Sequence, residues 1–224
     1  MKRTLGLILV LCLLIGLSTT AVSAETKKIK IGYDIYFLGN SWSVQLAEEF
    51  KYAVQKYADE IEVVYVDSQG DADKQVANLE DLIAQNVDVI ITTPWSSVAP
   101  IPVIREARAE GIKVVLLAAM IDSDDYDCLV TCDEVEFGKA GAQWLADQLG
   151  GKGDIICLNG ISGLSTSEQR WQGAQEVFAN YPDIKILASP DAKWDYAEGK
   201  IITADLLAAY PQIDGVWSQG GAMT

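Results

Sequence analysis

Short apolar runs alternate with helical patterns along nearly the whole chain, and this alternation limits the possible folds more than any other feature. Apolar strands without polar alternation are buried on both faces, which is typical of a parallel sheet covered by helices. The sequence therefore predicts a doubly wound α/β fold. The expected strands are residues 30–36, 62–67, 87–92, 113–117, 129–131, 154–158, 185–189 and 215–218, and the expected helices are residues 43–57, 73–85, 100–110, 135–149, 168–180 and 197–210.

The alternation is interrupted once, which predicts two lobes. Residues 120–127 turn polar, and the acid pair Asp124 and Asp125 is expected to be solvated linker. The strand and helix pattern restarts after the next short strand. We therefore place a first lobe at residues 25–131 and a second lobe at residues 132–224, each with a Rossmann-like parallel sheet.

The N-terminal segment, residues 1–24, has the three parts of a secretory signal peptide. Lys2 and Arg3 begin it, an apolar run follows, and small residues end it at Ala24. The alternative is a membrane anchor, but the apolar run is shorter than the ~20 residues that a membrane span needs. We therefore expect cleavage after Ala24 and export to the periplasm or the cell exterior.

The charge balance excludes several classes of partner. The sequence has 17 basic and 32 acidic residues, a net charge of −15. Removing Lys2 and Arg3 with the signal peptide would leave 15 basic residues against the same 32 acidic ones, a net charge of −17. This charge repels nucleic acid and anionic membrane surfaces, so we predict neither as a partner.

The residue types needed for common catalytic and cofactor sites are missing from the sequence. It contains no histidine, the usual base of hydrolase triads and a frequent zinc ligand. It also lacks the glycine motifs that bind nucleotide phosphates. We therefore predict no enzyme activity, no metal and no cofactor, and we keep a sugar-modifying enzyme only as a remote alternative.

Three cysteines would remain in the exported chain: Cys128, Cys132 and Cys157. An odd number does not form a disulfide framework, and an extended strand would hold Cys128 and Cys132 about 13 Å apart, too far for a disulfide. We therefore expect all three to be buried apolar side chains. Trp144 in a helix and Trp217 in a strand are expected in the core as well.

Aromatic and polar residues gather in the loops that follow the expected strands, where ligands of open parallel sheets bind. Asn40 and Trp42 follow the first strand, Trp95 follows the third, and Trp194 follows a strand of the second lobe. Arg170 lies in a Gly/Ser-rich turn between a strand and a helix. Indole rings stack on the C–H faces of sugars, and arginine donors bind hydroxyl oxygens, so these five residues predict a sugar site.

Each of these residues also has a purely structural interpretation. A single loop tryptophan can pack into its own loop, and Arg170 can form a surface ion pair with Glu168 or Glu176. Three loop tryptophans together favour a shared binding site.

Several segments carry motifs that can be compared with a known family: residues 39–42 (Gly-Asn-Ser-Trp), 66–69, 78–83, 159–170, 182–184 and 210–217. Together they resemble the ribose-binding-protein-like periplasmic receptors of ABC sugar importers. The resemblance implies a type I periplasmic binding protein fold, in which a monomer closes two lobes on a sugar and then contacts a membrane permease. Matching positions imply that Asn40, Trp42, Arg170 and Trp194 contact the sugar.

Two positions depart from the pattern of that family. It commonly has Asp and Arg after the fourth strand, where this chain has Ala118 and Ala119, and Asn-Asp after the last strand, where this chain has Gly220 and Gly221. These changes remove groups that would hold pentose hydroxyls. We therefore hypothesise a ligand that is larger or more apolar than ribose.

The resemblance also implies a longer protein, with the rest of the second lobe and a further hinge strand after Thr224. A chain without them is expected to bind its ligand weakly or not at all. A ligand-sensing receptor for a chemotaxis or kinase partner would have the same pocket, and it remains the main alternative to an importer subunit.

Overall fold

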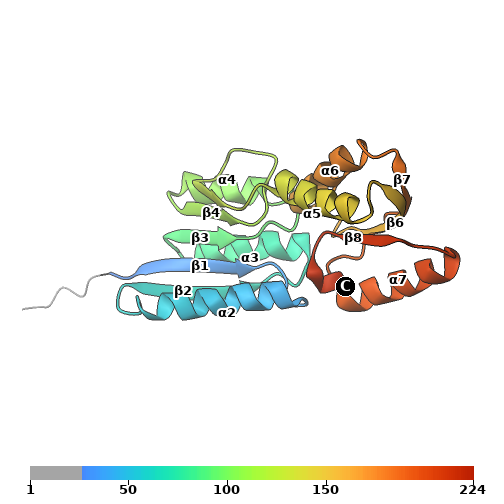
Figure 1. Ribbon diagram of the computed structural model, residues 1–224. Coiled ribbons are helices and arrows are strands. Elements are labelled where there is room, and N and C mark those ends of the chain that lie inside the picture. The colour runs from blue at the N-terminus through green and yellow to red at the C-terminus, as the bar shows by residue number, and fades with distance from the viewer. Residues whose placement is uncertain (1–26) are drawn as a thin grey trace, which may run out of the picture.

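The computed structural model describes residues 27–224, which form two lobes side by side (Figure 1). The signal peptide expected at residues 1–24 lies outside the described residues, so its cleavage stays a prediction. Within the described chain, no helix has both the length and the apolar character needed to cross a membrane.

The first lobe contains a five-stranded parallel sheet in the order β2-β1-β3-β4-β5. Its strands are β1 (Ile29–Ile35), β2 (Ile61–Asp67), β3 (Val89–Thr92), β4 (Lys113–Leu117) and β5 (Cys128–Val130). All the strand pairs are parallel, as the unbroken apolar runs predict, so the strands end at a common edge. That edge faces the second lobe (Figure 1).

Helices cover both faces of this sheet. Helices α3 (Ala72–Ala84) and α4 (Ile101–Ala109) pack with Ile90 of β3 in one buried cluster, and α2 (Ser41–Gln55) lies beside Ile91 in another. Because successive side chains of a strand point to opposite faces, these two neighbours contact different helix layers. Burial on both faces explains why the strands have no polar alternation.

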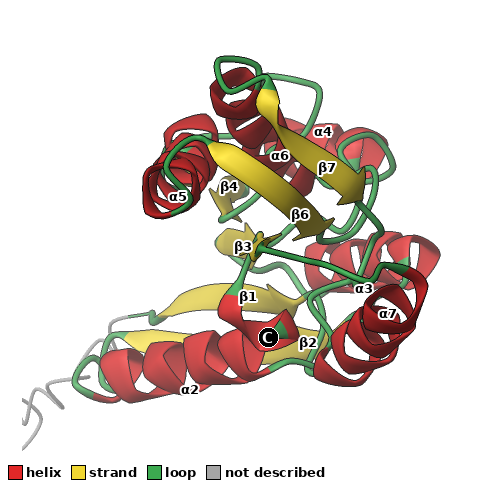
Figure 2. Cartoon of the chain, turned by 45° about the vertical axis from the view of Figure 1, so that its right-hand side comes forward, coloured by secondary structure: helices red, strands yellow, loops and turns green. Residues whose placement is uncertain are grey.

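The second lobe contains a three-stranded parallel sheet in the order β7-β6-β8. Its strands are β6 (Lys152–Leu158), β7 (Asp183–Ala188) and β8 (Gly215–Ser218). Helices α5 (Glu134–Gln148) and α6 (Ser165–Phe178) pack on one face of the sheet. Helix α7 (Tyr196–Ala209) and the short 3₁₀ helix η1 (Gly221–Met223) lie on the other (Figure 2).

Helices α5 and α6 cross at two glycines. A Cβ atom on Gly138 would lie 2.0 Å from the carbonyl oxygen of Arg170, and one on Gly173 would lie 2.0 Å from that of Val135. Only glycine allows the two backbones to approach this closely. The crossing brings Arg170 of α6 beside Glu134 at the start of α5.

The α/β class, the parallel strands and the order of elements agree with the sequence-based predictions. Element ends differ by a few residues. Helix α6 begins at Ser165 instead of residue 168, because Glu168 lies inside its first turn and accepts a hydrogen bond from Gly163 N at 3.0 Å. The lobe boundary between residues 131 and 132 stays a prediction.

The expectation that all three cysteines are buried is wrong for two of them. Cys128 and Cys132 are exposed, because β5 is a three-residue edge strand and Cys132 lies beyond it. Cys157, on central strand β6, is buried, and burial raises the pKa of its thiol to about 12. All three thiols are free.

Two other expectations are corrected by the packing. Trp144 has 64% of its surface exposed, because Ala142, Leu145 and Ala146 form the buried face of α5 and Trp144 points away from it. Trp217 is buried, as expected. Asp125 is not free linker: it pairs with Arg105 Nε at 2.5 Å, whereas Asp124 is exposed.

Candidate ligand-binding site

A cavity of about 500 Å³ lies between the two lobes. Its walls are built from residues that follow the carboxyl ends of β1, β3, β4 and β5 in the first lobe and β6, β7 and β8 in the second. This is where open parallel sheets bind ligands. The lining residues are Tyr36, Asn40, Trp42, Thr93, Leu117, Ala118, Ala119, Val130, Thr131, Cys132, Glu134, Phe137, Leu164, Thr166, Arg170, Trp194, Gly220, Gly221 and Ala222.

The first-lobe wall is aromatic and begins at the N-terminus of α2. Asn40 caps this helix, because its Oδ1 accepts a hydrogen bond from Ser43 N at 2.9 Å, and its Nδ2 lies 3.4 Å from the Tyr36 hydroxyl. One amide hydrogen of Asn40 is left for a ligand. The Trp42 ring packs 6.3 Å from the Tyr36 ring and keeps 47% of its surface exposed.

Trp95 does not line the cavity, although the sequence pattern grouped it with the other site residues. Its ring lies 5.7 Å from that of Tyr36 and 5.9 Å from that of Phe37. Its backbone N–H donates to Gln75 Oε1 at 2.8 Å. Trp95 therefore supports Tyr36 from behind the wall.

A buried carboxylate, Asp34, organises the base of this wall. It is fully buried and accepts hydrogen bonds from Ser68 Oγ at 2.5 Å, Gln75 Nε2 at 2.6 Å and Thr92 Oγ1 at 2.7 Å. Burial raises the pKa of Asp34, and these hydrogen bonds oppose the rise. Gln75 also donates to the carbonyl of Thr93, which lines the cavity, so the network fixes that loop.

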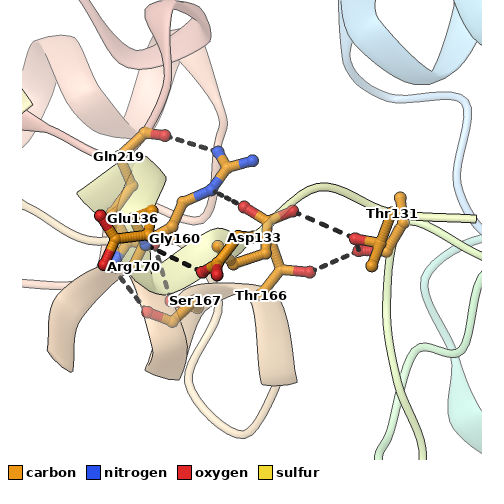
Figure 3. A network of polar contacts seen from close by, with 10 residues as sticks. Thr131, Asp133, Glu136, Gly160, Thr166, Ser167, Arg170 and Gln219 are labelled. Atoms are coloured by element: carbon orange, nitrogen blue, oxygen red, sulfur yellow. Dashed lines mark hydrogen bonds and ion pairs between the residues drawn. The ribbon is translucent and has the colours of Figure 1, made fainter. Parts of the chain in front are cut away.

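The second-lobe wall is organised by an ion pair. Arg170 Nε donates to Glu134 Oε2 at 2.6 Å. Its Nη1 donates to the backbone carbonyl of Gln219 at 2.7 Å (Figure 3). The guanidinium group lies 4.1 Å from the centre of the Phe137 ring. The exposed fractions of the Arg170 and Glu134 side chains are 18% and 5%, so this pair is largely buried.

The surface ion pairs considered for Arg170 from the sequence are not formed. Glu168 accepts from Gly163 N, and Glu176 pairs with Lys139 at 3.0 Å. Both acidic residues lie on α6 itself, whereas the true partner, Glu134, comes from α5. Arg170 is therefore held at the cavity and not on the outer surface.

The side chain of Gln219, next to Arg170, forms hydrogen bonds that link the ends of two strands to the start of a helix. Its side chain is fully buried; Oε1 accepts from Gly160 N at 3.0 Å and from Ser167 Oγ at 2.9 Å. Its Nε2 donates to Asn159 Oδ1 and to the carbonyl of Ser167. These contacts join the ends of β6 and β8 to the start of α6 and fix the carbonyl to which Arg170 donates.

The indole ring of Trp194 forms a flat aromatic surface on the second lobe. A Cβ atom on Gly160 would lie 2.4 Å from its ring, and one on Gly220 would lie 3.4 Å away, so glycine at residue 160 is needed for the ring to lie there. The residue has φ of +52°, a conformation that costs energy for a bulky side chain. Its indole Nε1 is buried and has no hydrogen-bond partner within residues 27–224.

The two lobes also contact each other directly beside the cavity. Thr166 Oγ1 donates to the carbonyl of Ala118 at 2.7 Å, and Met120 N donates to Ser165 Oγ at 2.8 Å. Ala118 adopts φ of +61°, which turns the chain sharply after β4. This segment therefore joins the N-terminus of α6 to the first lobe.

Sequence reasoning missed Tyr36, Glu134, Phe137 and Leu164 as lining residues. The rule that ligands bind at carboxyl ends of strands could have found Tyr36, which follows β1, and Glu134, which lies shortly after β5. Phe137 follows one helical turn later on the same helix. Within residues 27–224, no cluster of three or more potential metal ligands is present.

Two lobes with parallel sheets, and a cavity between their carboxyl ends, match the fold of type I periplasmic binding proteins. The sequence comparison agrees. Residues 31–224 match the family described as periplasmic binding protein domain, and the chain belongs to this family.

Two similar proteins of known function bind a sugar alcohol and a sugar. The chain is 33% identical to a xylitol-binding protein of Mycolicibacterium smegmatis, over 93% of this chain and 58% of that protein. It is 29% identical to a ribose import binding protein of Bacillus subtilis, over 90% of this chain and 65% of that protein. The chain thus spans about three fifths of the length of these two relatives. They are named for binding and import, not for an enzymatic reaction.

Two solved structures share the fold. An ABC transporter periplasmic solute-binding protein from Actinobacillus succinogenes with bound D-allose is 30% identical, with a TM-score of 0.79 over 88% of this chain and 70% of that one. The fructose-binding periplasmic domain of a hybrid two-component system is 28% identical, with a TM-score of 0.80 over 85% of this chain and 63% of that one.

Proposed function

We propose that this chain is the extracytoplasmic sugar-binding subunit of an ABC importer, exported by the signal peptide at residues 1–24. As a monomer it binds a sugar or related polyol in the cavity, and its closed form contacts a membrane permease. The observation that carries the proposal is that one cavity joins Trp42 of the first lobe to Arg170 and Trp194 of the second. A ligand that touches both lobes stabilises the closed state.

The available groups suit a polyol with apolar faces. The rings of Trp42 and Trp194 can stack on C–H faces, and each contributes about 0.5–1.5 kcal/mol beyond burial. Asn40 has one free amide hydrogen, and Arg170 has free Nη hydrogens. These donors match hydroxyl oxygens.

The ligand is larger or more apolar than ribose. Ala118, Ala119, Gly220 and Gly221 all line the cavity, and their side chains cannot donate hydrogen bonds. A larger ligand would fill the space, and a more apolar one would need fewer donors. The relative that binds D-allose, a hexose, supports this proposal, whereas the xylitol and ribose relatives bind five-carbon ligands.

Titration with sugars tests the function. We would add xylitol, D-allose, D-fructose and D-ribose to the protein and follow tryptophan fluorescence and ligand-observed NMR up to high millimolar concentrations. We expect saturable binding of at least one sugar, with ribose the weakest. Trp42→Ala should weaken binding about two- to tenfold, because a ring that stacks on the sugar is lost. Trp144→Ala is the matched control, since Trp144 is exposed and does not line the cavity.

Absence of saturable binding for every sugar, measured on the full-length protein, would overturn the proposed function. Ribose binding tighter than that of D-allose and D-fructose would overturn only the proposal about ligand size. An equal loss in the Trp42→Ala and Trp144→Ala proteins would show that the cavity is not the binding site.

A sensory receptor is the second candidate, and the likeness to the fructose-binding domain of a hybrid two-component system favours it. Import and sensing both need a closed ligand-bound form, so the cavity would be the same. Affinity capture of detergent-solubilised membranes with sugar-loaded protein separates them. Recovery of a permease supports import, and recovery of a histidine kinase or chemotaxis receptor supports sensing.

A further inference from the structure

The cavity wall carries one pair of opposite charges. Glu134 and Arg170 are the only charged side chains among the lining residues of the described chain. Their 2.6 Å contact joins a carboxylate that is 5% exposed to a guanidinium that is 18% exposed. A ligand in the cavity therefore meets a wall without net charge.

Both members of the pair are held in place by other groups. Arg170 also donates to the carbonyl of Gln219 and lies over the Phe137 ring. Glu134 lies in the first turn of α5, next to the helix cap Asp133, and its second oxygen lies 3.5 Å from Thr131 Oγ1. Neither side chain can leave the pair without breaking further contacts.

We infer that Glu134 is a specificity-determining residue that makes the cavity select neutral polyols and reject sugar acids. This inference rests on the proposed function. A carboxylate or phosphate that approached Arg170 would meet the Glu134 carboxylate at short range, in a site where charges are weakly screened. If it displaced Glu134, it would leave that carboxylate buried without its partner, which is costly.

A neutral hydroxyl faces no such conflict. It can accept from the Nη hydrogens of Arg170 that the pair leaves free, while Nε stays bonded to Glu134. It can also donate to a carboxylate oxygen of Glu134. The pair thus offers donors and acceptors to hydroxyls and no net attraction to an anion.

The negative charge of the whole protein also disfavours anions, and it must be separated from the local effect. Long-range repulsion is screened by salt, with a Debye length of about 10 Å at 0.1 M and about 3 Å at 1 M. Glu134 is buried, and salt screens interactions of buried charges much less than those of exposed ones. Salt therefore removes the long-range contribution and leaves most of the local one.

Matched neutral and acidic sugars test the inference. We would measure the affinities of xylitol and D-xylonate, and of D-galactose and D-galacturonate, for the wild-type protein, Glu134→Gln and Glu136→Gln. Glu136 is on the same helix and its side chain is 66% exposed, so Glu136→Gln removes the same charge without touching Arg170. We expect the wild type to favour the neutral member of each pair. Glu134→Gln should shift that preference toward the acid by about tenfold or more, and Glu136→Gln by less than about twofold.

Salt dependence of the wild type provides a test that does not require Glu134→Gln to fold. The preference for neutral sugars should persist at 1 M NaCl. Loss of the preference at high salt, or equal shifts in the two glutamine proteins, would overturn the inference. Wild-type protein that binds the acids as tightly as the neutral sugars would overturn it while leaving sugar binding intact. If no sugar of either kind binds, the proposed function fails and the inference fails with it.

Discussion

The two walls of the cavity are fixed by different electrostatics. Under the first-lobe wall, the buried carboxylate of Asp34 is held by three neutral donors. On the second-lobe wall, the guanidinium of Arg170 is held by the carboxylate of Glu134 and a carbonyl. Burial of Asp34 raises its pKa, whereas in the second lobe the opposite charges compensate each other.

The two walls should therefore lose different amounts of stability when single residues in them are replaced. Removing one partner of a buried ion pair leaves the other charge without compensation, which costs more than the loss of one of three hydrogen bonds to a carboxylate. The second-lobe wall should therefore be more sensitive to single substitutions than the first. Substitutions in each wall test this contrast, and the largest loss is expected at the ion pair.

Arg170→Leu should lower the free energy of unfolding by about 3 kcal/mol, because Glu134 would be left buried without its partner. Urea denaturation measures the loss. Arg170→Leu combined with Glu134→Leu should recover most of the stability, since no charge then remains buried. A double variant that is as unstable as the single one would contradict this interpretation.

Gly138→Ala should lower the free energy of unfolding by about 2 kcal/mol, because the new Cβ would lie 2.0 Å from the backbone oxygen of Arg170 and force α5 and α6 apart. Gly141→Ala is the control on the same helix, because its Cβ meets only the Trp217 side chain at 3.2 Å. Thermal and urea denaturation compare the two. Equal losses would show that the close crossing does not determine the stability of this wall.

Thr92→Val should cost about 1.5 kcal/mol of unfolding free energy, at the lower end for a hydrogen bond to a charged group. The substitution keeps the shape of the side chain and removes one of the three donors to Asp34. Asp34 keeps its donors Ser68 and Gln75, although Gln75 loses the Thr92 hydroxyl as an acceptor. If this loss equalled that of Arg170→Leu in the same urea experiment, the proposed difference between the walls would be wrong.

The titration of Asp34 should make the free energy of unfolding depend on pH. Its pKa is raised in the folded protein, so the folded state takes up a proton at higher pH than the unfolded state does. Wild-type stability should therefore rise relative to Asp34→Asn as the pH falls from neutral toward the usual range of an aspartate, near 3.8. Exposed aspartates with lowered pKa values, such as Asp88 and Asp214, lose stabilisation on acidification in both proteins and cancel in the difference. A constant difference across this range would contradict the prediction.

Much of the site followed from a single rule applied to the sequence. Because parallel strands end at a common edge, the positions of Trp42, Arg170 and Trp194 after strand ends were enough to assign them to one region. The structure places all three, with Asn40, on one cavity wall or the other. Trp95 follows a strand end as well, but Tyr36 lies between it and the cavity, a detail of side-chain packing that no local pattern encodes.

The sequence by itself determined the layers of this protein, because burial of a strand on both faces and of a helix on one face leaves a local periodic pattern. It also placed the turns that carry the aromatic residues. Only the tertiary structure decided the partner of Arg170, which is 36 positions away at Glu134, and the carbonyl at Gln219, which is 49 positions away. Such contacts depend on how closely α5 and α6 cross, and two glycines set that distance only once both helices are packed on the sheet.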